Sequence, residues 1–186
     1  MTRERILNAA VELLSRRDAT DVAMQDIAAR AGVSVRTVYR NFATRDDLFD
    51  GVVGAIKQRV TELAGSPPTT PDEFAASAGG VVGAVYEIEP LYRALFATQT
   101  GRESHQRSAP NRRAEIEAAF AAVLADVGEH EATLLGAVVH LVTSSNAVLF
   151  LKDYWGLDAD DAGRALQWVI GVVTDALKEP HARHSL

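Results

Sequence analysis

The sequence predicts an all-α protein, and three observations support this prediction. Aromatic residues make up only 6% of the 186 residues and alanine is abundant, whereas strands favour aromatic and β-branched residues. Apolar residues recur at helical spacing from the N-terminus onward, beginning with Ile6, Ala10, Leu13 and Leu14. The chain contains no cysteine, which excludes disulfide frameworks, thiolate metal sites and cysteine catalysis. An apolar core between helices is therefore the expected source of stability.

The first part of the chain predicts three short helices at about 2–17, 24–31 and 35–41. Gly32 follows the second of these helices, and glycine commonly ends a helix because it accepts the left-handed conformation. Ser34 precedes the third helix, at the position where its hydroxyl can accept an unpaired backbone N–H.

The third of these helices is basic on one side. Val38 and Phe42 are four positions apart, so both can face the core. This leaves the remaining surface to Val35, Arg36, Thr37, Tyr39 and Arg40. Residues 30–45 contain four arginines and no acid, whereas the whole chain has a net charge of −6. A basic stripe on an acidic protein is the electrostatic footprint of a nucleic-acid contact.

Two short helices separated by a glycine-containing turn, the second rich in arginine, are typical of a helix-turn-helix, whose second helix enters the major groove. Over residues 26–49 the sequence DIAARAGVSVRTVYRNFATRDDLF resembles the DNA-binding signature of the tetracycline-repressor (TetR) family. The resemblance covers about residues 3–60. It implies a helix-turn-helix DNA-binding domain over residues 1–45 and a helical effector-binding and dimerisation domain over residues 46–180. The implied activity is transcriptional regulation, most often repression.

The resemblance also implies which residues contact DNA. Bases or adjoining phosphates would be approached by Val35, Arg36, Thr37 and Arg40, phosphate oxygens by Ser34 and Tyr39, and the DNA backbone by Arg45, where the family usually has a lysine. The spacing of Arg36 and Arg40 agrees, since residues four apart project from one helix face and a guanidinium can bond guanine O6 and N7. Either arginine could read a base while the other holds a phosphate. Ala23 stands where the family usually has a Thr or Ser that caps the second helix, and losing such a cap costs ~1 kcal/mol.

The rest of the chain predicts further helices at about 45–64, 72–88, 90–99, 110–127, 130–155 and 159–178. A proline-rich loop over residues 65–71 separates the first of them from the others, because no helix continues through it. The polar residues 100–111 predict a second loop, and residues 181–186 predict a disordered tail.

Residues 132–151 carry no Asp, Glu, Lys or Arg, over a length that could span a membrane. The middle of this segment is polar, and polar groups are costly at bilayer depth, so we expect a buried helix and no membrane partner. The N-terminus is charged and periodic at once, unlike a signal peptide. The expected location is cytoplasmic.

The same segment contains a group of polar residues, His140, Thr143, Ser144 and Asn146. One interpretation is that they hydrogen-bond within the protein or across a dimer, since buried polar groups need partners. The other is that some of them orient an unidentified small-molecule effector in an apolar cavity lined by Phe74, Tyr86, Tyr92, Phe96 and Phe120. Because the sequence predicts no cluster of buried charges there, the expected ligand is hydrophobic or aromatic.

The last predicted helix carries a broad apolar stripe that includes Leu166, Val169, Ile170 and Val173. Sharing this stripe across a two-fold axis, as a four-helix bundle, is the expected way to cover it. The resulting homodimer would bring two recognition helices to successive major grooves. The predicted partner is therefore double-stranded DNA with a pseudo-palindromic operator.

No catalytic group, metal site or cofactor is predicted. The five histidines offer no set of metal ligands, and His140 with Ser144 lacks a third group that would orient the imidazole. We therefore predict a repressor, not an enzyme, that a small and mostly hydrophobic ligand releases from a palindromic operator. The alternative is a helix-turn-helix DNA-binding protein with no small-molecule effector, acting constitutively or through a protein partner.

Overall fold

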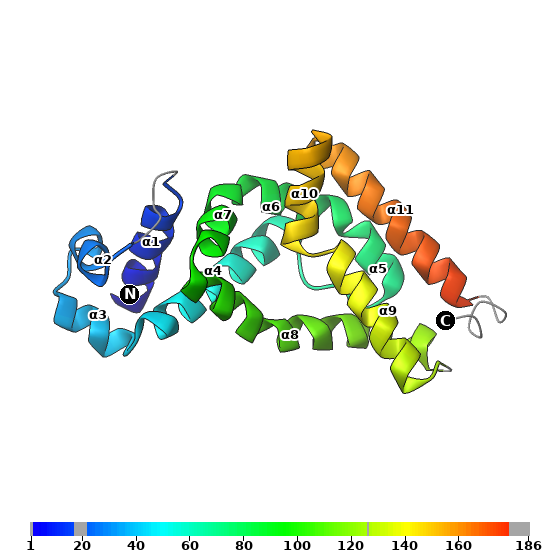
Figure 1. Cartoon of the computed structure of the whole chain (residues 1–186), viewed down its shortest axis with the longest axis horizontal. Coiled ribbons are helices and arrows are strands. Elements are labelled where there is room, and N and C mark those ends of the chain that lie inside the picture. Colours follow the sequence, from blue (N-terminus) through cyan, green and yellow to red (C-terminus); the bar gives the residue numbers. More distant parts are fainter. Residues whose placement is uncertain (1, 17–21, 126, 179–186) are drawn as a thin grey trace. The chain divides into compact units, whose positions relative to one another are not determined.

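The computed structural model describes residues 2–16, 22–125 and 127–178, which form eleven helices and no strand (Figure 1). The all-α prediction is confirmed for these residues. The predicted end of the first helix at residue 17 and the predicted tail, residues 181–186, lie outside them.

The chain divides into two compact units, each built from segments that are distant in the sequence. The first contains residues 1–59 and 88–109, and the second contains residues 60–87 and 110–186. The helices α4 (Arg45–Ala64) and α8 (Gln99–Leu124) contribute residues to both units. The functional division between residues 45 and 46 remains a prediction.

The first unit begins with α1 (Thr2–Leu14), α2 (Met24–Ala31) and α3 (Val35–Asn41). Together with the first half of α4, these helices contribute a set of buried side chains: Ile6, Ile27, Val38, Phe42, Leu48, Phe49 and Val52. Gly51 allows α4 to approach closely, because a Cβ atom there would lie 2.8 Å from Leu7 Cδ2 and 3.0 Å from Phe42 Cε1. This part of α4 is thus packed directly against Phe42, the residue that follows α3.

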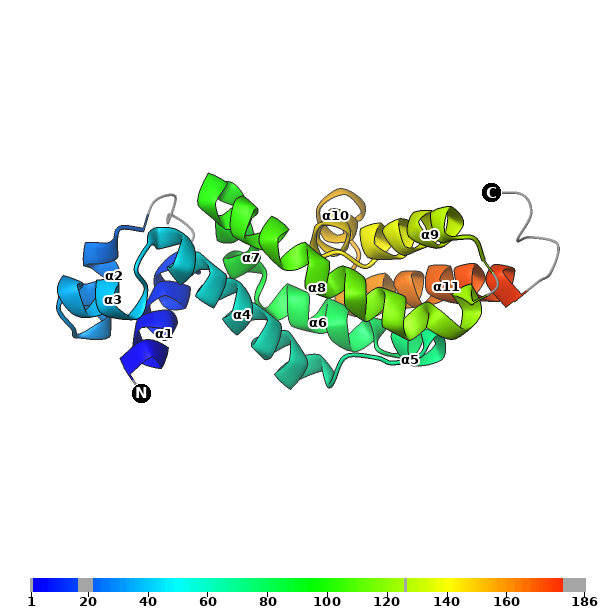
Figure 2. The same cartoon turned by 90° about the horizontal axis from the view of Figure 1, so that it is seen from below.

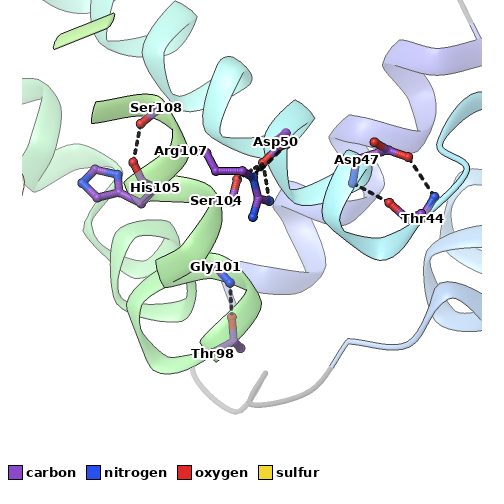
Figure 3. A network of polar contacts seen from close by, with 9 residues as sticks. All are labelled: Thr44, Asp47, Asp50, Thr98, Gly101, Ser104, His105, Arg107 and Ser108. Carbon is purple, nitrogen blue, oxygen red and sulfur yellow. Dashed lines mark hydrogen bonds and ion pairs between the residues drawn. The ribbon is translucent and has the colours of Figure 1, made fainter. Parts of the chain in front are cut away.

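The first unit also contains α7 (Glu89–Ala97), which packs against α1, and the first half of α8. This part of α8 shows that the loop predicted over residues 100–111 is wrong, since these residues are helical. Thr98 Oγ1 accepts the N–H of Gly101 at 3.0 Å at the start of α8 (Figure 3), and Gln99 donates to the Glu103 carboxylate one turn on at 2.7 Å. A polar helix of this kind carries no apolar periodicity from which it could be predicted.

The second unit contains the rest of α8 together with α5 (Pro71–Ala76), α6 (Ala78–Glu87), α9 (Glu129–Val142), α10 (Ser145–Trp155) and α11 (Ala159–Lys178). In this unit α11 lies along α6 and α5 (Figure 2). Phe74 of α5 and Phe120 of α8 are both buried and pack edge to face, with ring centroids 5.5 Å apart. This aromatic pair forms part of the core of the second unit.

Two predicted helices are each divided in the structure. Residues 72–88 are interrupted at Ser77, and residues 130–155 are interrupted at Thr143 and Ser144, where α9 and α10 meet at a bend of 48°. Thr143 Oγ1 donates to a backbone carbonyl one turn back at 2.7 Å, and Ser144 Oγ accepts a backbone N–H at 3.1 Å as the N-cap of α10. Such side-chain bonds compete with continuation of the helix. Within the described ranges no single helix has the length and apolar composition of a membrane span, and α9 and α10 meet that test only as a bent pair.

Candidate nucleic-acid interface

The turn between α2 and α3 has the geometry that its sequence predicts. Gly32 adopts a left-handed φ of 64°, and its N–H donates to a carbonyl of the last turn of α2 at 3.2 Å. Ser34 Oγ accepts the N–H of Thr37 at 3.1 Å and so begins α3. At the start of α2, Ala23 supplies no side-chain cap, but the Asp26 carboxylate accepts the Ala23 N–H at 3.4 Å. This bond satisfies the N–H of Ala23 itself, which is the other half of a capping box.

The helix α3 has one buried and one exposed side. Val38 is fully buried, whereas Arg36, Tyr39 and Arg40 are exposed. Arg36 and Arg40 line a hollow of about 360 Å³ at the surface together with Thr37. The structure therefore brings two guanidinium groups and a hydroxyl to one open surface. These groups can donate hydrogen bonds to base edges or to phosphate oxygens.

Three other predicted contact residues begin α3 or follow it. Ser34 is exposed, and its hydroxyl also shares a hydrogen bond of 2.9 Å with Thr37 Oγ1. Val35 is half-buried in the first turn of α3. Arg45 is half-buried at the start of α4, with its guanidinium 5.5 Å from the centroid of the Phe49 ring. Contact with DNA remains a prediction for each of the three.

Arg30 belongs to the basic stripe of the sequence, but in the structure it is held by an acid of α1. It forms an ion pair with Glu12, which also accepts a hydrogen bond from Arg16 at 3.4 Å. The hydrogen bond from Arg30 holds the pKa of Glu12 below its usual value. The cationic surface predicted over residues 30–45 is therefore reduced at this position.

Two arginines of α1, Arg3 and Arg5, have a structural role that the sequence analysis missed. Arg5 Nη2 donates to Ala31 O at 2.7 Å, at the last residue of α2, and Arg3 Nη1 donates to Asn41 O at 2.8 Å, at the last residue of α3. The Arg3 guanidinium also lies 4.1 Å from the centroid of the Phe42 ring. Each cation thus meets the negative end of a helix dipole. The only signal in the sequence is the excess of arginine over acid across residues 1–45, because residues 2–14 themselves contain equal numbers of the two.

The aromatic residues predicted to line an effector cavity fall into two groups. Phe74, Phe120 and Tyr86 belong to the second unit, where the Tyr86 hydroxyl donates to the carbonyl of residue 157 at 3.0 Å. Tyr92 and Phe96 belong to the first unit, where their rings stack with centroids 6.0 Å apart. Each unit therefore gathers its own aromatic residues.

The polar residues predicted to orient a ligand include two whose hydroxyls have backbone partners. These are Thr143 and Ser144 at the break between α9 and α10. Asn146 is exposed in the first turn of α10. His140 is half-buried, and burial first, then the positive charge of Arg112, lower its pKa below the usual value.

Arg112 is a residue that the sequence analysis did not place in this region. Its guanidinium lies 5.0 Å from the centroid of the Phe74 ring, and Nη2 lies 3.4 Å from Thr143 Oγ1. Glu115 pairs with it at 3.5 Å. Both side chains are partly exposed, so the expectation that no cluster of buried charges lies here stays a prediction, but α8 does bring a cation and its acid beside the aromatic core.

The predicted dimer stripe on α11 is partly core. Leu166 and Ile170 are only 7% and 1% exposed, because helices of the same chain cover them, whereas Val169 and Val173 are half-buried. The assignment of Leu166 and Ile170 to a dimer interface is therefore wrong. A different set of apolar residues of α9 and α11 is exposed: Leu134, Val138, Leu141, Trp168 and Val172.

Comparison with known proteins agrees with this geometry. Residues 6–52 match the model of the family described as bacterial regulatory proteins, tetR family. A comparison with curated proteins gives no match. A transcriptional regulator from Rhodococcus sp. RHA1 is similar in structure over 95% of this chain and 97% of its own, with a TM-score of 0.64 and 17% identity. A TetR-like transcriptional regulator from Rhodococcus sp. RHA1 is similar over 91% and 93%, with a TM-score of 0.63 and 21% identity.

NalD, the secondary repressor of the MexAB-OprM multidrug efflux pump in Pseudomonas aeruginosa, is also similar in structure. The similarity covers 92% of this chain and 94% of NalD, with a TM-score of 0.59 and 19% identity. At these identities the solved structures show a shared fold, while the family model matches the helix-turn-helix itself. The N-terminal segment, residues 6–52, thus belongs to the TetR family, and the chain as a whole shares the fold of these solved regulators.

Proposed function

We propose that this chain is a DNA-binding transcriptional regulator that acts as a repressor. The observation that carries the proposal is the exposed pair Arg36 and Arg40, which line one hollow with Thr37 while Val38 anchors the opposite side of α3. An α-helix fits the major groove, and a guanidinium fork can donate two parallel hydrogen bonds to guanine. The match of residues 6–52 to the model of the TetR family supports the same function.

We further infer that the repressor is a homodimer joined through the exposed apolar residues of α9 and α11. We call this set the α9–α11 face, and it consists of Leu134, Val138, Leu141, Trp168 and Val172. On each helix these residues recur at helical spacing, and Leu141 and Trp168 are 68% and 72% exposed. Exposed apolar patches mark interaction sites, and a two-fold axis would present two α3 helices to a pseudo-palindromic operator.

The proposed control is release from the operator by a small, mostly hydrophobic ligand bound among the helices that follow the helix-turn-helix. The match of residues 6–52 to the TetR family supports this control, whereas Phe74 and Phe120 pack against each other as almost fully buried core. The alternative is a repressor with no small-molecule effector. The hydroxyls of Thr143 and Ser144 favour the alternative, since both are bonded to backbone.

Selection of bound DNA from random duplexes tests the proposed function. The full chain should enrich a pseudo-palindromic sequence. Arg36→Ala or Arg40→Ala should weaken binding to that sequence by ~1–3 kcal/mol if the deleted arginine reads a base. Fluorescence anisotropy at constant salt measures the affinity, since phosphate contacts make binding depend on salt.

Arg113→Ala is the matched control, because it also removes one exposed arginine but does so in the second unit. It should retain the affinity of the parent. If no sequence is enriched, or if both α3 variants bind the enriched duplex as tightly as the parent does, the chain does not read DNA through α3. If the chain does bind the enriched duplex, a screen of small hydrophobic compounds for release of that duplex separates ligand control from a repressor with no small-molecule effector.

A further inference from the structure

Asp50 of α4 connects the segment after the helix-turn-helix to the first half of α8, within the first unit (Figure 3). Its carboxylate accepts a hydrogen bond from Ser104 Oγ at 2.6 Å. It also accepts hydrogen bonds from Arg107 Nε at 3.1 Å and from Arg107 Nη2 at 2.7 Å. Ser104 and Arg107 are three positions apart on α8, so both can reach one carboxylate from the same helix face.

The chemistry of this contact favours a fixed geometry. Two nitrogens of one planar guanidinium bind the same carboxylate, an arrangement that restricts orientation more than a single contact does. Ser104 is only 2% exposed, so its hydroxyl needs a partner inside the protein. Burial alone would raise the pKa of Asp50, but the hydrogen bonds from Arg107 and Ser104 outweigh it and lower the pKa. The carboxylate is therefore ionised at neutral pH.

The position of Asp50 on α4 connects this contact to the recognition helix. The neighbouring residues Phe49 and Val52 are buried in the core of the first unit, and Gly51 lies directly against Phe42, which follows the last residue of α3. A single stretch of α4 thus holds the end of α3 through apolar contacts and holds α8 through Asp50. The packing of α7 against α1 is a second attachment of residues 88–109 to the same unit.

We propose that Asp50 is a positioning residue for DNA recognition, which, through Ser104 and Arg107, fixes α8 to α4 and so maintains the orientation of α3. The inference rests on the proposed DNA-binding function. Residues 99–109 then belong to the machinery that reads DNA, although they lie far from the helix-turn-helix in the sequence. Loosening the contact should reduce discrimination between operator and random DNA, because discrimination requires correctly placed base contacts.

The test compares the affinity of the full chain for the selected duplex with its affinity for a random duplex of equal length, at constant salt. Asp50→Asn removes the charge and keeps the size of the side chain, and Arg107→Gln removes the guanidinium. Asp50 and Arg107 are 47% and 43% exposed, and partly exposed ion pairs have modest effects. Each variant should therefore lower the affinity ratio by about two- to fivefold.

The charge-swapped pair Asp50→Arg with Arg107→Asp should restore much of the ratio, which a general loss of stability would not produce. Glu117→Gln is the matched control, because it breaks another arginine–carboxylate pair on α8, at 2.6 Å, and removes the same charge. It should leave the ratio unchanged. Hydrogen exchange of the amides of residues 99–109 provides a readout without DNA, and exchange there should be faster in Asp50→Asn than in the parent.

The outcomes separate the inference from the function on which it rests. A parent chain that binds every duplex equally overturns the proposed function. A parent that discriminates, with Asp50→Asn and Arg107→Gln variants that discriminate equally well, overturns the positioning role alone. The same conclusion follows if both variants lose stability while their affinity ratio stays that of the parent. Arg107→Gln changes an exposed side chain, so it keeps the test open if Asp50→Asn fails to fold.

Discussion

At the scale of single residues, the partner of each arginine decides whether DNA can use its charge. Arg30 is paired with Glu12, and Arg3 and Arg5 are bound to carbonyls that end α3 and α2. Arg36 and Arg40 instead line an open hollow. An arginine already bound within the protein must break that bond to contact a phosphate, whereas an exposed one exchanges only water. The number of arginines in residues 1–45 therefore overstates the capacity of this segment to bind DNA.

Arg5→Ala tests the structural role of α1. Arg5 donates to Ala31 O at the negative end of α2, so its loss should lower the free energy of unfolding by about 0.5–1.5 kcal/mol. Urea denaturation followed by circular dichroism measures the change. Arg16→Ala is the control, because the Arg16 side chain is 63% exposed. Among the contacts described, it pairs only with Glu12 of α1, at 3.4 Å. Equal losses in the two variants would contradict a capping role for Arg5.

His140 predicts a dependence of stability on pH. Burial and the charge of Arg112 lower its pKa below 6.5 in the folded chain, so between the two pKa values the unfolded chain binds more protons. The free energy of unfolding therefore rises with pH through this window, and this stabilisation is lost as the pH falls below about 6.5. The thermal midpoint should decrease as the pH is lowered from about 7.5 to about 5.5, and His140→Gln should make that decrease smaller.

The exposed His130 of the same helix supplies the control for this measurement. His130→Gln should show the full fall of the parent. An unchanged fall in His140→Gln would mean that other groups cause the dependence on pH.

At the scale of helices, elements with local signals could be predicted from the sequence. The α2 and α3 helices have a left-handed glycine and a capping serine at their ends, and both signals act within a few residues. The helix over residues 99–124 has no comparable apolar pattern, and its polar first half resembles a loop in composition. The break at Thr143 and Ser144 depends on hydrogen bonds that periodicity does not reveal.

Pro110→Ala tests whether residues 100–111 are helical. Proline inside a helix removes one backbone hydrogen bond, whereas alanine is the best helix former. The free energy of unfolding of the variant should therefore exceed that of the parent by about 1–3 kcal/mol. In a loop the same change would be neutral or destabilising, because proline restricts the unfolded chain. Chemical denaturation distinguishes these outcomes, and no gain in stability would contradict a continuous α8.

At the scale of the whole molecule, the sequence could identify apolar faces but not their partners. The last helix carries apolar residues on more than one side, and the pattern alone cannot tell an internal core from an interface. Ile170 and Leu166 are buried by helices of the same chain, while Trp168 and Val172 remain exposed. The place of Arg112 could not be predicted either, because its neighbours Phe74 and Thr143 are distant from it in the sequence.

The exposed and buried residues of α11 make the dimer testable with a matched pair of variants. Val172 is 48% exposed and Ile170 is 1% exposed, yet the two are close neighbours on one helix. Val172→Asp should produce folded monomers, because a charge placed in the proposed α9–α11 face opposes its burial by a second copy. Ile170→Asp should instead unfold the chain, since it buries an unpaired charge in the core.

Light scattering after size-exclusion chromatography reports the mass, and circular dichroism reports the fold. If the parent is a dimer that contacts both half-sites, the Val172→Asp monomer should bind the palindrome at least about 100-fold more weakly, because the second recognition helix is no longer held nearby. Its affinity for an isolated half-site should match that of the parent, since α3 is unchanged. A parent that is monomeric at micromolar concentration, or a Val172→Asp variant that remains dimeric, would show that the α9–α11 face does not join the two copies. Recognition of a palindrome would then require a different contact surface.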